Sequence, residues 1–150
     1  GTAGTLKKNI DFLKNDGGFL LHADNLCKEN LNKFIEAHNN RPKNCLFTLM
    51  SFKTSQPKNC GILKTYKKIL ISYEEKPKHP KSCLANGALY FLSNQFLINF
   101  KKSDFFSQSQ DFSRDIIPKY LNQIYTYKTN KLFIDIGNIK TYEKYKETIL

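Results

Sequence analysis

The sequence predicts an α/β fold in which helices flank a mixed, mostly parallel β-sheet. Short apolar runs typical of buried strands alternate with stretches whose apolar residues recur at helical spacing. Some predicted strands follow one another directly, so part of the sheet is expected to be antiparallel. Hydrophobic residues make up 40% of the 150 residues, enough for the core of one domain. No apolar run approaches the roughly 18 residues that span a bilayer.

The predicted elements follow from this pattern in chain order. Strands are expected at residues 19–21, 45–52, 61–63, 69–71, 88–92, 125–127 and 132–134. Helices are expected at residues 5–15, 26–39, 95–100 and 142–150, and residues 101–110 are polar enough for a loop. One more helix carries Ile116 and Ile117; Ser113 is expected to cap it, with Pro118 in its first turn.

The charge of the chain favours anionic partners. The formal net charge is +11, which suits a nucleotide, a sugar phosphate or a nucleic acid. The lysines are spread almost evenly along the chain. Arginine, the usual bidentate reader of bases and phosphates, occurs only at Arg41 and Arg114. This distribution does not favour specific nucleic-acid binding.

The cysteines and histidines show no metal-binding or catalytic spacing. The cysteines have no CxxC pair and no histidine cluster beside them, so no zinc site is expected; they are Cys27, Cys45, Cys60 and Cys83. Scattered thiols in a domain of this size fit a reducing cytosol. The histidines lack the partners of a catalytic triad and are interpreted as structural or surface residues: His22, His38 and His79.

Two aspartates follow apolar strands. Asp24 comes just after the run at 19–21, and Asp135 comes directly after the run at 132–134. In open α/β sheets, ligands bind beyond the carboxyl ends of the strands, and a carboxylate there can hold Mg²⁺. Asp24 has an equally good alternative role as the N-cap of the helix expected from Leu26.

Glu75 and Lys76 are adjacent at a predicted strand end, directly before Pro77. Adjacent residues in a strand point to opposite faces, so both charges can enter one pocket only if the backbone turns. A proline at 77 makes such a turn plausible. The alternative is a solvated run of charges at 74–76. Ten residues further on, Asn86–Gly87 begins the next strand with a small polar step.

The chain opens with Gly1–Thr2–Ala3–Gly4 at the start of a predicted helix. Small residues at a helix N-terminus allow a base or a phosphate to approach the backbone. Such a short segment is weak evidence by itself.

Taken in order, several segments resemble the sugar-1-phosphate nucleotidyltransferases. They are GTAGTL, FLLHADNL, CGIL, EEKP, LANGALYFL, SRDIIP and FIDIG. The mannose- or heptose-1-phosphate guanylyltransferases and related glucose-1-phosphate enzymes look closest. The resemblance covers the whole chain and implies a Rossmann-like nucleotidyltransferase fold. The family's glycine-rich NTP-binding signature and its P-K-P element are absent and would precede Gly1. Residues 1–150 are therefore expected to be the C-terminal two-thirds of a single, N-terminally truncated nucleotidyltransferase domain, inactive by itself.

The resemblance also implies roles for single residues. Asp24 and Asp135 would hold Mg²⁺, and Asp24 and Lys76 would be catalytic, with Lys76 contacting the sugar phosphate. The remaining substrate-binding positions are the base site Gly1, Thr2, Ala3 and Gly4, the sugar-hydroxyl ligands Gly61 and Glu75, and the pocket-shaping pair Asn86 and Gly87.

The function implied is the joining of an NTP, with GTP favoured, to a sugar 1-phosphate, giving an NDP-sugar and pyrophosphate. A GDP-mannose or GDP-heptose product would serve surface polysaccharide synthesis. A cytoplasmic protein with no membrane or nucleic-acid partner is expected, and a homo-oligomer is left open. Two alternatives remain: a non-catalytic sugar-phosphate-binding or regulatory module, because the NTP loop is absent, and a basic nucleic-acid-binding protein, because of the charge.

Overall fold

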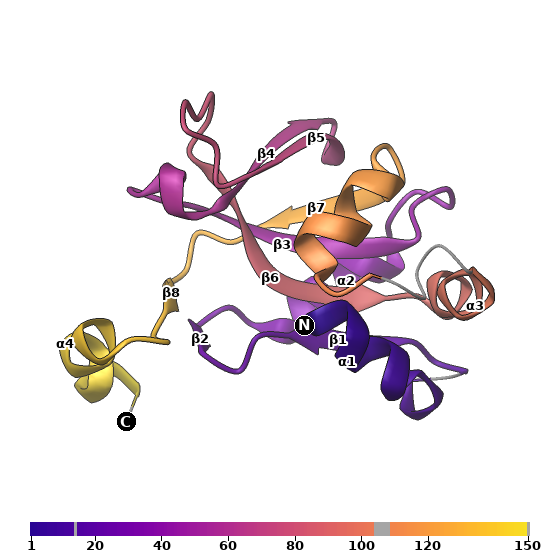
Figure 1. The fold of residues 1–150 in the computed structure, drawn as a ribbon, viewed down its shortest axis with the longest axis horizontal. Helices are drawn as coiled ribbons and strands as arrows, with labels where there is room; N and C mark the ends of the chain where they lie inside the picture. Colours follow the sequence, from indigo (N-terminus) through magenta and orange to yellow (C-terminus); the bar gives the residue numbers. More distant parts are fainter. Residues whose placement is uncertain (14, 104–108, 150) are drawn as a thin grey trace.

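The structure is a computed structural model that describes residues 1–13, 15–103 and 109–149. Its centre is a six-stranded sheet in the order β1-β6-β3-β7-β5-β4, and a separate pair is formed by β2 and β8 (Figure 1). The strands are β1 Gly18–Leu21, β2 Asn25–Cys27, β3 Phe47–Lys53, β4 Gly61–Tyr66, β5 Ile69–Glu75, β6 Leu84–Leu92, β7 Ile124–Lys128 and β8 Phe133–Asp135.

Helices and helical turns connect and cover these strands. The α-helices are α1 Thr2–Lys8, α2 Leu31–Asn39, α3 Asn94–Lys102 and α4 Ile139–Ile149. The shorter helical segments are η1 Ile10–Phe12, η2 Pro57–Asn59, η4 Phe112–Ile116 and η5 Ile117–Tyr120. In the part of the chain that the structure describes, no helix has the length and apolar character needed to cross a membrane.

The sheet is mixed, as predicted, but it is not mostly parallel. Among the pairings described, β3–β7 is parallel. The pairings β1–β6, β3–β6, β4–β5 and β5–β7 are antiparallel. A parallel pair needs a crossover of a dozen or more residues, whereas neighbouring antiparallel strands need only a short turn. The two-residue turn Lys67–Lys68, where both residues have positive φ, joins β4 to β5 in this second way.

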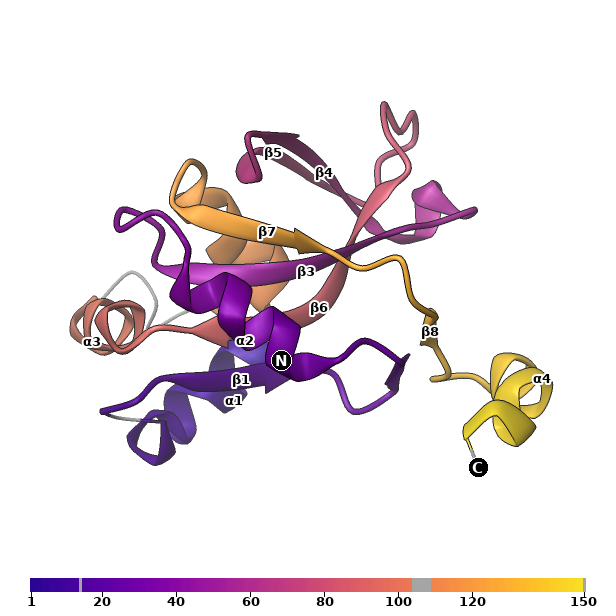
Figure 2. The ribbon, with the colours of Figure 1, turned by 180° about the vertical axis from the view of Figure 1, so that it is seen from behind.

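Helical segments cover both faces of the sheet. Figure 1 shows α1 and the segment η4–η5 in front of it, and Figure 2 shows α2 on the opposite face. The larger core lies under the first group and contains, among others, Phe47, Tyr90, Phe96, Phe112 and Ile117. A smaller core contains Phe34 of α2 together with Met50, Leu89 and Phe133. Helix α4 follows β8 and extends away from the sheet (Figure 1).

Two predicted helix starts are wrong. Residues 26–39 do not form one helix: Leu26 lies in β2, and α2 begins after Asn30, whose side chain accepts a hydrogen bond from the backbone N–H of Asn32 at 2.9 Å. Ser113 is not the cap of the later helix. Asp111 caps η4 instead, because its carboxylate accepts from the N–H of Arg114 at 2.8 Å.

The other predicted elements are largely present, with shifted ends. The first helix begins at Thr2 and ends at Lys8 rather than covering residues 5–15. Strand β6 begins at Leu84, so Asn86 and Gly87 lie inside it rather than at its start. The predicted loop at 101–110 falls partly outside the described residues, and so does the last residue of the predicted helix at 142–150.

Candidate functional site

The two aspartates singled out in the sequence meet at Gly137. Oδ2 of Asp24 lies 2.7 Å, and Oδ1 of Asp135 lies 3.0 Å, from the position that a Cβ on Gly137 would occupy. The backbone N–H of Gly137 donates to the same Oδ1 of Asp135 at 2.7 Å. Both aspartates are exposed to solvent. Two carboxylates therefore approach the same small region of backbone.

The pairing of β2 with β8 brings these carboxylates together. Asn25 is directly opposite Asp135 in this antiparallel pair, and the N–H of Ile136 donates to the carbonyl oxygen of Asp24 at 2.8 Å. Both aspartates were expected at the carboxyl ends of strands in an open α/β sheet. Instead, Asp24 lies between β1 and β2 and Asp135 ends the short β8. The alternative role of Asp24 as a helix N-cap is excluded, because Leu26 belongs to a strand.

The donor set fits Mg²⁺ better than a metal held by protein ligands alone. Mg²⁺ is commonly bound through one or two carboxylates, with water and substrate phosphates completing its shell. Among the described residues, no group of three or more His, Cys, Asp or Glu side chains could hold a metal ion. Two adjacent carboxylates also repel each other, and a cation between them relieves that repulsion.

Glu75 and Lys76 lie where the chain leaves β5 and turns. Glu75 is the last residue of the strand, and Lys76 has a φ of 44°, in the left-handed region. The N–H of Lys76 donates to the carbonyl oxygen of Cys60 at 3.1 Å, which ties the turn to the start of β4. The expected turn between the two charges is therefore present. The strand that carries Glu75 pairs it with Gly61.

Tyr73 joins this group, although the sequence analysis did not select it. Its hydroxyl hydrogen-bonds to Oε2 of Glu75. A Cβ on Gly61 would overlap the same phenol, with Cζ only 2.7 Å away. Tyr73 precedes Glu75 by two residues in one strand, so the two side chains lie on the same face. That spacing was a usable signal for finding it.

Asn86 connects β6 to the segment η4. Its Nδ2 donates to the hydroxyl of Tyr90 at 2.8 Å and to Oγ of Ser113 at 3.2 Å. Its Oδ1 accepts from the N–H of Ala88 at 2.9 Å, which holds a bulge in β6 where the register to β3 shifts. Gly87 is required beside it, because a Cβ there would meet Phe133 at 2.9 Å.

Asn25 links the carboxylate pair to β6. Its Nδ2 donates to the carbonyl oxygen of Gly87 at 2.9 Å, while its backbone pairs with Asp135. The predicted metal residues and the predicted pocket residues Asn86–Gly87 are thus neighbours. Asn25 was also missed by the sequence analysis, although it follows Asp24 directly.

The N-terminal segment lies beside η4. Oγ1 of Thr2 accepts from the N–H of Phe112 at 3.0 Å, and the N–H of Ala3 donates to the carbonyl oxygen of Gln110 at 3.0 Å. Phe112 directly precedes Ser113, the partner of Asn86. The predicted base site at residues 1–4 is therefore connected to Asn86 through the adjacent residues Phe112 and Ser113 of η4.

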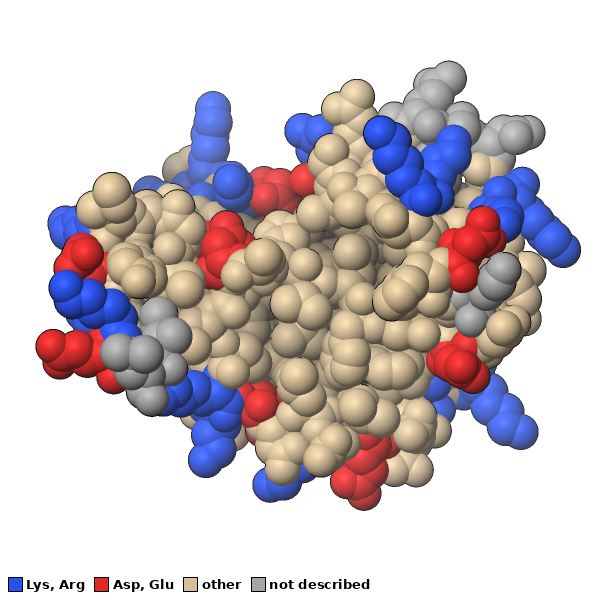
Figure 3. Space-filling view, turned by 90° about the horizontal axis from the view of Figure 1, so that it is seen from below, with Lys and Arg blue, Asp and Glu red and all other residues tan. Residues whose placement is uncertain are grey.

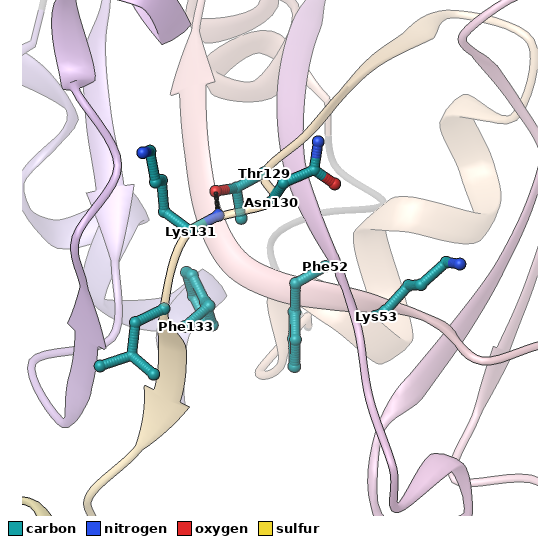
Figure 4. A pocket seen from close by; sticks show the side chains of 7 residues that line it. Phe52, Lys53, Thr129, Asn130, Lys131 and Phe133 are labelled. Atoms are coloured by element: carbon teal, nitrogen blue, oxygen red, sulfur yellow. Dashed lines mark hydrogen bonds between the residues drawn. The ribbon is translucent and has the colours of Figure 1, made fainter.

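A surface pocket lies elsewhere. It is lined by Phe52, Lys53, Thr129, Asn130, Lys131, Leu132 and Phe133. None of the predicted sugar-site residues lines it. In Figure 4 the side chains of Lys53 and Lys131 point away from each other, so they do not converge on one anion.

The charges do not form a continuous basic surface on the face drawn in Figure 3. Positive and negative side chains are interspersed around its edge, and its centre is uncharged. Nucleic-acid binding through this face is not favoured, since it would need clustered cations along the backbone path.

Known proteins resemble this chain along its whole length. A family model described as Nucleotidyl transferase matches residues 1–150. The glucose-1-phosphate adenylyltransferase of Clostridium perfringens (strain 13 / Type A) is 29% identical over 150 residues, a match that covers 94% of this chain and 38% of that protein. The enzyme of the same name from Mycoplasma mobile is 28% identical over 155 residues, covering 95% and 40%.

Solved structures share the fold. A putative glucose-1-phosphate thymidylyltransferase from Bacillus anthracis, in complex with sucrose, superposes with a TM-score of 0.84 at 20% identity, covering 99% of this chain and 60% of that one. HddC from Yersinia pseudotuberculosis, complexed with GMP-PN, gives 0.77 at 21% identity, covering 100% and 63%.

The chain spans about two-fifths of the length of the curated relatives and less than two-thirds of the solved structures. Its mixed sheet with flanking helices is the nucleotidyltransferase fold of those structures. Because the family model matches all 150 residues, the chain belongs to the nucleotidyl transferase family.

Proposed function

We propose that this chain forms the sugar-phosphate side and the metal site of an enzyme that joins an NTP to a sugar 1-phosphate. The observation that carries the proposal is the hydrogen bond from Asn25 to Gly87 at 2.9 Å. It places a pair of exposed carboxylates beside the polar segment Asn86–Gly87, in a chain of the nucleotidyl transferase family. The proposed metal site, which would bind phosphate groups, is then adjacent to the proposed sugar site.

In the proposed reaction, an oxygen of the sugar phosphate attacks the α-phosphorus of the NTP. A new P–O bond forms, the bond to the β-phosphate oxygen breaks, and pyrophosphate leaves. No covalent protein intermediate is needed, so the protein contributes positioning and charge neutralisation. Mg²⁺, when bound, would neutralise phosphate charge.

The chain's own residues have separate roles in this scheme. Asp24 and Asp135 would hold the metal ion. The ammonium of Lys76 would contact the sugar phosphate, and the carboxylate of Glu75 would accept hydrogen bonds from sugar hydroxyls. Gly61 would let the sugar approach the backbone of β4, and residues 1–4 would lie near the base.

We further propose GTP as the nucleotide and a mannose- or heptose-type 1-phosphate as the sugar, on the resemblance of the ordered segments. The product would serve surface polysaccharide synthesis in the cytoplasm. The names of the relatives point instead to adenylyl or thymidylyl transfer to glucose 1-phosphate. A panel of GTP, ATP, dTTP and CTP against several sugar 1-phosphates, with pyrophosphate detection, decides between these pairs.

The reaction itself is tested with the full-length protein. Lys76→Ala and Asp135→Ala are each expected to lower pyrophosphate release by about tenfold or more, because the first removes the proposed cationic contact to the sugar phosphate and the second removes a proposed ligand of the metal ion. Lys78→Ala is the matched control, an exposed lysine of the same loop. Normal turnover in both test variants would refute the site assignment.

A second function, sugar-phosphate binding without catalysis, is the alternative outcome of the same panel. Binding of a sugar 1-phosphate with no pyrophosphate release from any NTP in the panel would establish this function instead.

A further inference from the structure

Tyr73 lies between the two residues proposed to hold the sugar. Its phenol oxygen hydrogen-bonds to Oε2 of Glu75. On the other side, the ring lies so close to Gly61 that a Cβ there would meet Cζ at 2.7 Å and Cε2 at 2.8 Å. Gly61 and Glu75 are opposite each other in the β4–β5 pair, so Tyr73 crosses the space above that pair.

The phenol remains a hydrogen-bond donor throughout the neutral range. Burial, followed by the hydrogen bond and the negative charge of Glu75, raises the pKa of Tyr73 far above its usual value. Because Glu75 is an acceptor when ionised, the proton of this bond comes from the phenol. Oε2 is thereby occupied. Within the described residues, no hydrogen bond is made by Oε1 of Glu75, which leaves that oxygen for a ligand.

Asn86 lies near the Tyr73 phenol, where it slightly offsets the rise in the pKa of Tyr73 that burial causes. Asn86 in turn is held by Tyr90 and Ser113, at 2.8 and 3.2 Å. Asn86 is therefore fixed to β6 and η4 near the phenol, and Glu75 cannot swing without breaking its own bond to Tyr73.

We propose that Tyr73 is a positioning and specificity-determining residue for the sugar 1-phosphate. This inference rests on the proposed sugar-binding role of Glu75. Tyr73 fixes the direction in which Oε1 of Glu75 accepts a sugar hydroxyl, and its ring limits the volume above Gly61. A sugar with a substituent directed at Gly61 is excluded, and a sugar whose hydroxyl meets Oε1 is selected.

The first test separates sugar binding from nucleotide binding in the full-length enzyme. Tyr73→Phe keeps the ring and removes the hydroxyl, so the KM for the sugar 1-phosphate is expected to rise about tenfold, while the KM for the NTP stays within about twofold. Tyr73→Leu opens the space above Gly61 and is expected to lower discrimination between sugar 1-phosphates that differ at one carbon by about tenfold.

Tyr66→Phe is the matched control. Tyr66 lies at the far end of the same hairpin, is exposed and contacts Lys67 through its ring, so both KM values are expected to stay unchanged. A purely structural role for Tyr73 would lower stability and change both KM values alike. That outcome, or no change in the sugar KM of Tyr73→Phe, would overturn the proposal.

A second test uses the contact with Gly61. Gly61→Ala is expected to weaken sugar binding in the wild-type background, because the added methyl group displaces the phenol. In a Tyr73→Leu background the same substitution is expected to weaken sugar binding by a several-fold smaller factor. Equal effects in the two backgrounds would show that the ring does not control this space.

Failure of the proposed reaction is distinguishable from failure of this inference. If the wild-type protein releases no pyrophosphate with any substrate pair, binding of each sugar 1-phosphate is measured directly by calorimetry. Weaker binding by Tyr73→Phe than by wild type and Tyr66→Phe then supports the inference alone. Equal binding by all three proteins, or no binding of any sugar 1-phosphate by the wild type, contradicts it.

Discussion

Oδ2 of Asp24 lies 2.7 Å from the point where a Cβ on Gly137 would be placed, on the side of the backbone that Asp135 also approaches. Gly137 has no positive φ that would forbid another residue. Glycine is therefore needed here because any side chain would collide with the two carboxylates.

Gly137→Ala is expected to raise the Mg²⁺ concentration for half-maximal pyrophosphate release about tenfold in the full-length enzyme. The added methyl group would push at least one carboxylate away from its position. A magnesium titration at saturating substrates measures this effect. Because Gly137 is exposed, the melting temperature should stay the same. A lower melting temperature with an unchanged magnesium requirement would contradict the prediction.

Asn25→Asp is expected to lower the free energy of unfolding by about 1–3 kcal/mol, because a carboxylate oxygen would replace the amide that donates to Gly87. Urea denaturation at pH 7 measures the change. Asn44→Asp is the matched control: its amide also donates to a backbone carbonyl, but at 3.5 Å and on the exposed surface. An equal loss in both variants would show that the bond to Gly87 contributes no more to stability than an exposed, weak hydrogen bond.

His38 is expected to make the fold sensitive to mild acid. It is 4% exposed, its Nδ1 lies 2.9 Å from Oγ1 of Thr48, and burial, with a smaller contribution from the charge of Arg41, lowers its pKa from 6.5 to about 4. The unfolded chain binds this proton more readily than the folded one. Stability is therefore full above pH 6.5 and is lost as the pH falls toward 4.

The loss from His38 should be about 1.4 kcal/mol for each pH unit below 6.5, down to about pH 5. Urea unfolding at pH 7.5, 6 and 5 measures it. His38→Asn is expected to flatten this dependence, whereas His79→Asn, at an exposed position, should leave it intact. A wild-type protein equally stable at pH 7.5 and 5 would disprove the assignment.

Ala88→Gly is expected to stabilise the fold by about 0.5–1 kcal/mol. Ala88 has a φ of 48°, where a Cβ is strained and glycine is not. Thermal unfolding followed by circular dichroism measures the gain. Ala85→Gly in the same strand is the control; it lacks positive φ and is fully buried, so it should lose stability. A loss in both variants would mean that the bulge tolerates Ala88 without strain.

Most strands could be predicted because each is a compact apolar run with polar ends, as at residues 19–21 and 69–71. The direction of pairing could not, because the alternation of strands and helices does not show which strands become neighbours. The error at residues 26–39 has a local cause. Leu26 lies eight residues before Phe34, a spacing that fits one face of a helix. The three-residue strand β2, in contrast, forms only through its distant partner β8.

The sequence singled out two aspartates that the structure brings together, but it did not show how they are brought together. Asp24 and Asp135 stood out as carboxylates after apolar runs. They meet because two short strands pair, not because parallel strands end together. Tyr73 was missed because a tyrosine in a strand looks like an ordinary half-buried residue, although its two-residue spacing from Glu75 places both side chains on one face.

The pairing of β2 with β8 joins two segments that are separated by most of the chain, residues 28–132. Closing so large a loop lowers the entropy of the chain, and only the contacts of the completed sheet offset this loss. Contacts between residues so far apart in the sequence also form slowly. A partly folded chain therefore holds Asp24 and Asp135 far apart. The two carboxylates come together only when folding is complete. An ion that binds both residues at once would therefore bind only the fully folded molecule.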